Sequence, residues 1–149
     1  MSYSIPHWVW DAVVVAVAAA ALWKGGRDER LAGSGMLLAA ILSKLLYQHA
    51  QATEWGILAT DAAALALFVW IALTSARWWP LFVAAFQFLA IVIHLARIVD
   101  RSLGGWAYIS AEILFGYLVA IGIALGTYNT WRALRARAVP ATDPGATRR

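Results

Sequence analysis

Five long apolar stretches, separated by short polar segments, dominate this chain of 149 residues. They cover residues 8–23, 31–47, 55–74, 80–99 and 106–131. A helix needs about 20 apolar residues to cross the ~30 Å hydrocarbon core of a bilayer. The alternating strands of a transmembrane barrel do not fit, because Val13–Leu22 is apolar on every face and Gln87 is the one polar residue in Leu81–Val92. The sequence therefore predicts an all-α integral membrane bundle of about five transmembrane helices over residues 1–138.

The composition agrees with a lipid environment. The chain is 62% hydrophobic and 13% charged, whereas soluble domains are about 45–50% apolar and about 25% charged. One small soluble core cannot hide that excess. The absence of cysteine excludes disulfides, thiolate metal sites and cysteine nucleophiles. Five of the twelve Lys and Arg residues lie in the last eighteen positions, so the positive charge indicates topology and contact with anionic lipid, and we expect no nucleic-acid partner.

Basic residues at alternate helix ends give the expected orientation. The short connections make successive helices antiparallel. One side of the bundle holds nine basic residues and the other holds three, namely Lys44, Arg97 and Arg101. Cytoplasmic loops carry the excess of Lys and Arg, which predicts an N-terminus outside (periplasmic) and a C-terminus inside. Residues 139–149 are rich in Pro, Gly and Thr and are expected to be a disordered cytoplasmic tail.

Ionisable residues inside the apolar stretches mark the candidate site. They fall about three to seven residues below the outer boundary, or roughly 5–10 Å at ~1.5 Å per residue. Charges in a membrane usually face the bundle interior and pair with one another. The opposite, cytoplasmic half is expected to be almost purely apolar. We therefore predict an intramembrane polar network formed by Asp11, Lys44, Asp61, Gln87, His94, Arg97 and Glu112.

The last stretch also carries small residues suited to close helix packing. Gly116 and Gly126 share a face with Glu112, which predicts that Glu112 points into the bundle. Gly122 and Gly126 form a GxxxG pair. This pair is expected to pack against a neighbouring helix or against a second copy of the chain.

A shift of fifty residues reveals a weak internal similarity. It aligns Asp11-Ala12 with Asp61-Ala62 and places Lys44 over His94. Two interpretations stay open, namely a duplicated helix hairpin in parallel arrangement and chance matches in an alanine-rich chain.

Several roles are compatible with the polar network. It can serve only to satisfy buried charges and fix helix register, or it can form an ion or proton pathway. A haem held by His94 and His49 is a third possibility, and a metal bound by Asp61, Glu112 and His94 is a fourth. The chain contains no P-loop, GxGxxG, GxSxG or HExxH motif, which argues against those soluble-enzyme classes.

One part of the chain resembles a known group of proteins. The residues are Ser75–Leu81 (SARWWPL), Ala84–Gln87 (AAFQ), His94–Arg97 (HLAR) and Asp100. They are similar to a pattern found in small polytopic inner-membrane proteins of proteobacteria. The resemblance implies a bacterial inner-membrane setting and no particular activity.

The leading hypothesis is a small non-enzymatic membrane protein that works as an accessory subunit of a membrane complex or as a homo-oligomer. Its expected partners are the lipid bilayer and other membrane subunits or itself. The alternatives are a small channel or transporter for ions, protons or a solute, and a haem- or pigment-binding subunit.

Overall fold

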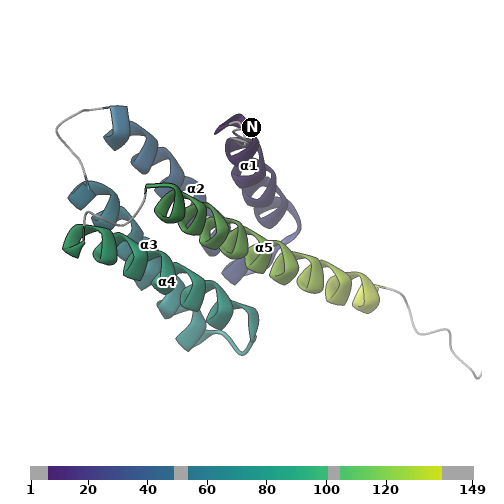
Figure 1. The fold of residues 1–149 in the computed structure, drawn as a ribbon. Coiled ribbons are helices and arrows are strands. Elements are labelled where there is room, and N and C mark those ends of the chain that lie inside the picture. The colour runs from purple at the N-terminus through teal and green to yellow at the C-terminus, as the bar shows by residue number, and fades with distance from the viewer. Residues whose placement is uncertain (1–6, 49–53, 101–104, 139–149) are drawn as a thin grey trace, which may run out of the picture.

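The computed structural model describes residues 7–48, 54–100 and 105–138, and all regular structure in these ranges is helical. The five helices are α1 (His7–Lys24), α2 (Arg27–Gln48), α3 (Glu54–Thr74), α4 (Trp79–Val99) and α5 (Gly105–Ala138) (Figure 1). The prediction of an all-helical chain is confirmed. Residues 139–149, predicted to be a disordered tail, lie outside the described ranges.

The helices pack in a closed order. Each helix contacts the next one along the chain, and α5 returns to contact α1 and, less extensively, α2. Figure 1 shows α5 crossing the other helices and extending beyond them. The core between them is built largely from small and branched side chains, such as Ala18, Ala21, Val83 and Ile123, together with the aromatic Phe68, each at most 1% exposed.

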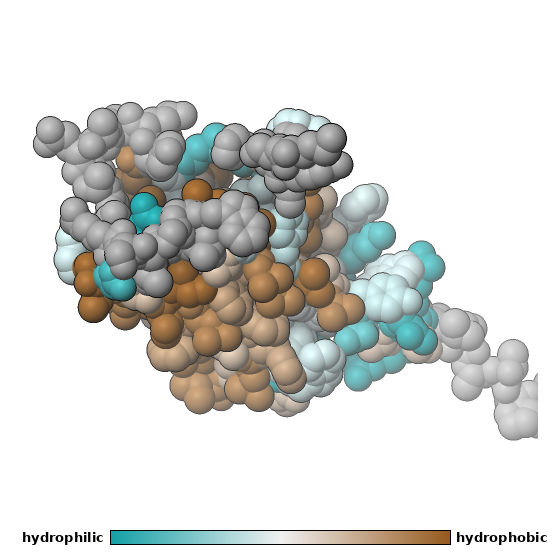
Figure 2. Space-filling model, in the orientation of Figure 1, coloured by the Kyte–Doolittle hydropathy of each residue, from teal (hydrophilic) through white to brown (hydrophobic). Residues whose placement is uncertain are grey.

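Three helices contain segments long and apolar enough to cross a membrane. These segments are Trp55–Thr74 in α3, Trp79–Val99 in α4 and Ile109–Arg137 in α5. Only 22% to 28% of the most apolar part of each is buried inside the bundle, so most of their apolar surface faces outward. Figure 2 shows apolar side chains over much of the visible face and hydrophilic ones gathered near the end of α5. Soluble monomers rarely expose apolar patches above a few hundred Å². These helices therefore indicate a membrane protein.

The helix boundaries differ from the apolar stretches mainly at α2 and α5. Each of the five stretches lies within one helix, but α2 begins four residues before the stretch that starts at Leu31. Its first turn holds Asp28 and Glu29, which suit the positive end of the helix dipole. The α5 helix continues seven residues past Trp131, because Arg, Ala and Leu are strong helix formers.

Candidate functional site

An acid–histidine cluster joins α3, α4 and α5. It consists of Asp61, Gln87, His94 and Glu112, one or two residues from each helix. The Nε2 atom of His94 lies 3.0 Å from Oδ2 of Asp61 and 3.8 Å from Oε1 of Glu112. Gln87 and His94 are seven residues apart, two helical turns, so they lie on the same face of α4. Both face the bundle, where they are 8% and 7% exposed.

Both carboxylate oxygens of Asp61 contact side chains of α4. The amide nitrogen of Gln87 donates to Oδ1 at 3.2 Å and lies 3.4 Å from the backbone carbonyl of Asp61. His94 contacts the other oxygen. Burial decreases across the cluster, because the Asp61 side chain is 20% exposed and that of Glu112 is 44% exposed. Glu112 thus lies at the edge of the bundle, which differs from its predicted position in the interior.

Asp11 and Lys44 form a separate ion pair between α1 and α2. Their Oδ2 and Nζ atoms are 2.6 Å apart, and their side chains are 48% and 61% exposed. They contact each other rather than the acid–histidine cluster. Arg97 lies one turn after His94 on α4 and is partly buried. Six of the seven predicted residues are therefore divided between two groups. The helical face on which a residue lies does not specify which neighbouring helix it contacts.

A second buried charge lies at the other end of the bundle, where the sequence predicted an almost purely apolar half. That expectation is wrong. Glu29 has no exposed surface, and its Oε1 atom accepts bonds from the guanidinium of Arg77 and, at 2.8 Å, from the hydroxyl of Thr130. Its Oε2 atom accepts the backbone N–H of Gly26 at 2.9 Å. We call Gly26, Glu29, Arg77 and Thr130 the Glu29 cluster.

Local chemistry explains why Glu29 turns inward. The carbonyl of Gly26 accepts the first helical bond of α2, from Arg30 at 3.1 Å, so Gly26 is the N-cap and Glu29 is the third helical residue. A glutamate at that position typically reaches back to the N-cap N–H. A Cβ at Gly26 would lie 3.0 Å from the Glu29 carboxylate, so glycine leaves room for the bond. This spacing was the available signal for Glu29, but Arg77 and Thr130 are too distant in sequence to be predicted as its partners.

The predicted packing glycines contact helices of the same chain. A Cβ on Gly122 would lie 2.7 Å from Val83 of α4, and one on Gly126 would lie 2.6 Å from the Trp79 ring. Gly116 faces Trp10 of α1 in the same way, at 3.0 Å. The GxxxG pair is therefore used between α4 and α5, and it is not available to a second copy.

Neither the haem nor the metal hypothesis has a formed site in the described ranges. His49 lies outside them, and Nε2 of His94 faces two carboxylates. Among the described side chains, no three His, Asp or Glu residues are grouped to hold a metal ion.

The acid–histidine cluster can pass a proton between groups or can simply neutralise buried charge, since an imidazole between two carboxylates suits both. Comparison of this chain with protein-family models, curated proteins and solved structures gives no match.

Proposed function

We propose that this chain is a five-span protein of the bacterial inner membrane, with its N-terminus outside and its C-terminus in the cytoplasm. We further propose that it works without catalysis, as an accessory subunit of a membrane complex or in an assembly of its own copies. In this orientation the Glu29 cluster lies at the cytoplasmic end. The Asp11–Lys44 pair then lies in the outer part of the bilayer.

The exposed Asp11–Lys44 pair carries this proposal. A charge that faces lipid is costly, and intramembrane charges almost always face protein or water. Half of the Asp11 side chain and more than half of the Lys44 side chain are open to the surroundings. A partner helix that covers this pair would remove the cost. Large apolar side chains beside it, such as Ile41 and Leu45, are also exposed and can extend the contact.

The other charged groups support a structural role for the remaining network. Asp61 pairs with His94, and Glu29 pairs with Arg77. The first pair joins α3 to α4, and the second joins α2 to the connection between α3 and α4. Each pair therefore helps to fix the arrangement of the helices. Two grooves among the described residues, one between α1 and α5 and one between α4 and α5, are lined mainly by apolar side chains and offer a substrate few polar contacts.

Photocrosslinking in native membranes tests the accessory role. A photoreactive residue at Ile41, beside Lys44, is expected to give one discrete crosslinked product. The matched control is Phe88 on α4, which is similarly exposed, at 54% against 48%, and belongs to a helix that does not contact α1 or α2. A product from Ile41 of twice the protein mass would identify a second copy as the partner. Equal labelling from both positions, or from neither, would contradict the proposal.

The geometry of His94 favours one second candidate, a proton pathway. Its Nε2 atom lies between carboxylates from two other helices, and intramembrane acids and histidines form proton relays in pumps and transporters. In that case Asp61→Asn and Glu112→Gln abolish proton flux into liposomes while the fold is retained. Thr60→Val is the control, because Thr60 is next to Asp61 and, among the described residues, its hydroxyl donates to the carbonyl of Gly56 and not to the cluster. Absence of flux with wild-type protein, together with a lower unfolding midpoint for Asp61→Asn, supports the structural role instead.

A further inference from the structure

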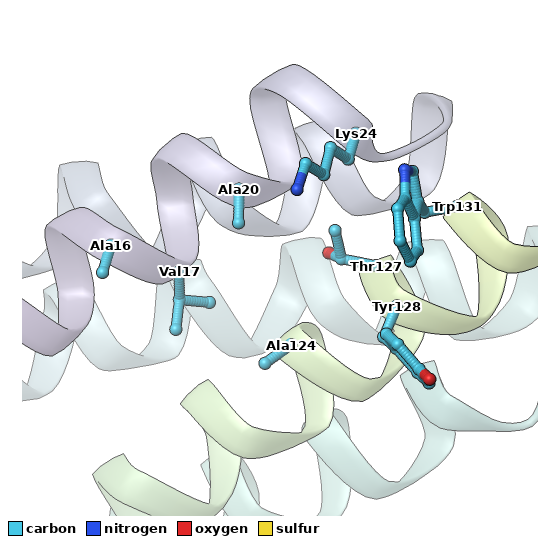
Figure 3. Close-up of a pocket in the computed structure, with 8 residues that line it drawn as sticks. All are labelled: Ala16, Val17, Ala20, Lys24, Ala124, Thr127, Tyr128 and Trp131. Carbon is cyan, nitrogen blue, oxygen red and sulfur yellow. The ribbon is translucent and has the colours of Figure 1, made fainter.

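A groove between α1 and α5 ends in a cluster of positive charge. It has a volume of about 300 Å³. Ala16, Ala20 and Lys24 of α1 are spaced four residues apart, so they lie along one face of the helix, and all three line the groove. Figure 3 shows Lys24 and Trp131 near one end of the groove and Ala16 and Val17 near the other. From Ala16 to Lys24 the groove follows about 12 Å of helix at ~1.5 Å per residue.

The walls of the groove are apolar. Alanines at positions 16, 20 and 124 leave the space open, and Val17 and Tyr128 complete the lining beside them. Thr127 also lines the groove, but its hydroxyl donates to the carbonyl of Ile123 at 2.9 Å. A hydrocarbon chain fits such walls, whereas a small polar ion gains nothing from them.

Two cations share the aromatic ring at the rim. The Nζ atom of Lys24 lies 5.1 Å from the centroid of the Trp131 ring, and the guanidinium of Arg135 lies 4.2 Å from the same centroid. A third cation, Arg132, lies 5.7 Å from the ring of Tyr128. Within the described part of the chain, none of the three makes an ion pair with a carboxylate. Two acids lie at the start of α2, but both already accept other hydrogen bonds. Asp28 accepts one from the hydroxyl of Ser75, and Glu29 accepts one from the hydroxyl of Thr130.

We infer that this groove binds one anionic phospholipid, with an acyl chain along α1 and the phosphate held between Lys24 and Arg135. Basic side chains at a membrane surface attract anionic headgroups, and apolar walls below them accept the tail. A second copy of this chain is the poorer occupant, because the same end of the bundle also exposes Arg27, Arg30 and Arg137. Two copies would bring like charges together. The inference requires insertion in a membrane but not the accessory role proposed above.

Native mass spectrometry of the full chain in detergent tests the inference. The protein is titrated with phosphatidylglycerol and with phosphatidylcholine of the same acyl chains. We expect a single bound phosphatidylglycerol, favoured about tenfold over phosphatidylcholine. Lys24→Gln with Arg135→Gln is expected to remove that preference. Ala20→Leu, which fills the groove, is expected to lower binding of both lipids.

Matched variants separate this site from general attraction to basic surface. Arg27→Gln removes an exposed cation whose ring contact is with Trp70, and Ala19→Leu adds the same bulk at an exposed position of α1 outside the groove. Both are expected to bind lipid as the wild type does. The inference is overturned by equal binding of the two lipids, by an equal loss in Arg27→Gln, or by displacement of the lipid with glycerol phosphate alone. Should the double variant lose helix content by circular dichroism, Lys24→Gln is measured in its place with the same criterion.

Discussion

Glu29 illustrates how much one residue can connect in this bundle. Its carboxylate contacts the N-cap of α2, the connection between α3 and α4, and the last third of α5. All three donors depend on the same two oxygens. Arg77 is 42% exposed and can recover part of its hydration if the contact is lost. Thr130 is buried and cannot do so in the same way.

Glu29→Gln is expected to lower the free energy of unfolding by about 2 kcal/mol. The substitution replaces one acceptor oxygen with an NH₂ group that faces donors, and it leaves the charge of Arg77 uncompensated. Unfolding by dodecyl sulfate in mixed micelles measures the change. The neighbouring Asp28 accepts a hydrogen bond from the Ser75 hydroxyl at 2.7 Å. Asp28→Asn keeps a side-chain oxygen for this bond and is expected to lower the free energy of unfolding by less than about 1 kcal/mol. Equal effects of the two substitutions would contradict this role of Glu29.

At the scale of helices, the contact between α4 and α5 depends on glycines of α5, which have no side chain to keep Val83 and Trp79 of α4 away. Trp79 is 2% exposed, and its indole nitrogen has no hydrogen-bond partner among the described residues. Packing against α5 at Gly126 therefore holds the ring. Because the ring is rigid and buried, it has little room to move away from an added methyl group.

The same substitution at two glycines tests this contact. Gly126→Ala is expected to destabilise the bundle by about 1–3 kcal/mol, since the new Cβ overlaps the Trp79 ring. Gly56→Ala is the matched control, because its Cβ would meet only the flexible end of Leu46 at 3.3 Å. Because alanine has the higher helix propensity, Gly56→Ala is expected to raise the free energy of unfolding by up to about 1 kcal/mol. A Gly126→Ala protein that unfolds at the wild-type denaturant concentration would contradict the packing described here.

The helices were more predictable from the sequence than the contacts between them. Apolar stretches such as Leu81–Val92 indicate helices directly, because their length and composition leave few other structures in lipid. The contact between Asp61 and His94 agrees with a layer of charges at one depth. The burial of Glu29 was not predicted, because Arg77 and Thr130 follow it by 48 and 101 residues. Periodicity along α5 indicates which residues share a face with Glu112, but not how far the neighbouring helices cover its side chain, which is 44% exposed.

At the scale of the whole molecule, the two helix hairpins use equivalent positions. Asp11 pairs with Lys44 between α1 and α2, and Asp61 pairs with His94 between α3 and α4. A shift of fifty residues relates both members of these pairs. The ends of α1 and α3, at Lys24 and Thr74, differ by the same fifty residues. The similarity therefore extends from residue identity to residue contact.

This equivalence predicts that lysine can replace His94. His94→Lys is expected to keep the unfolding midpoint near that of the wild type, because lysine already pairs with an aspartate at the matching position 44. His94→Leu removes the imidazole that contacts Oδ2 of Asp61 and is expected to cost about 3 kcal/mol. Unfolding in mixed micelles distinguishes the two variants. Equal destabilisation would indicate that the two hairpins are not interchangeable at this position.

The number of spans and their orientation can be tested with single cysteines, because the chain has none of its own. With five spans, Arg27→Cys at the start of α2 and Arg137→Cys near the end of α5 both lie in the cytoplasm. A membrane-impermeant maleimide is then expected to label them only after cells are permeabilised. Trp8→Cys, which is 69% exposed in the structure, is expected to be labelled in intact cells.

Arg27 is the informative position. If only α3, α4 and α5 cross the membrane, then α1 and α2 both remain outside when the C-terminus is inside, and Arg27→Cys is labelled in intact cells together with Trp8→Cys. The opposite orientation of the bundle would reverse the labelling of Trp8→Cys and Arg137→Cys. Five spans place Arg27 on the same side as the Arg-rich end of α5, as the positive-inside rule requires. Labelling of Arg27→Cys only after permeabilisation, with Trp8→Cys labelled from outside, is therefore the result that five spans predict and three spans cannot give.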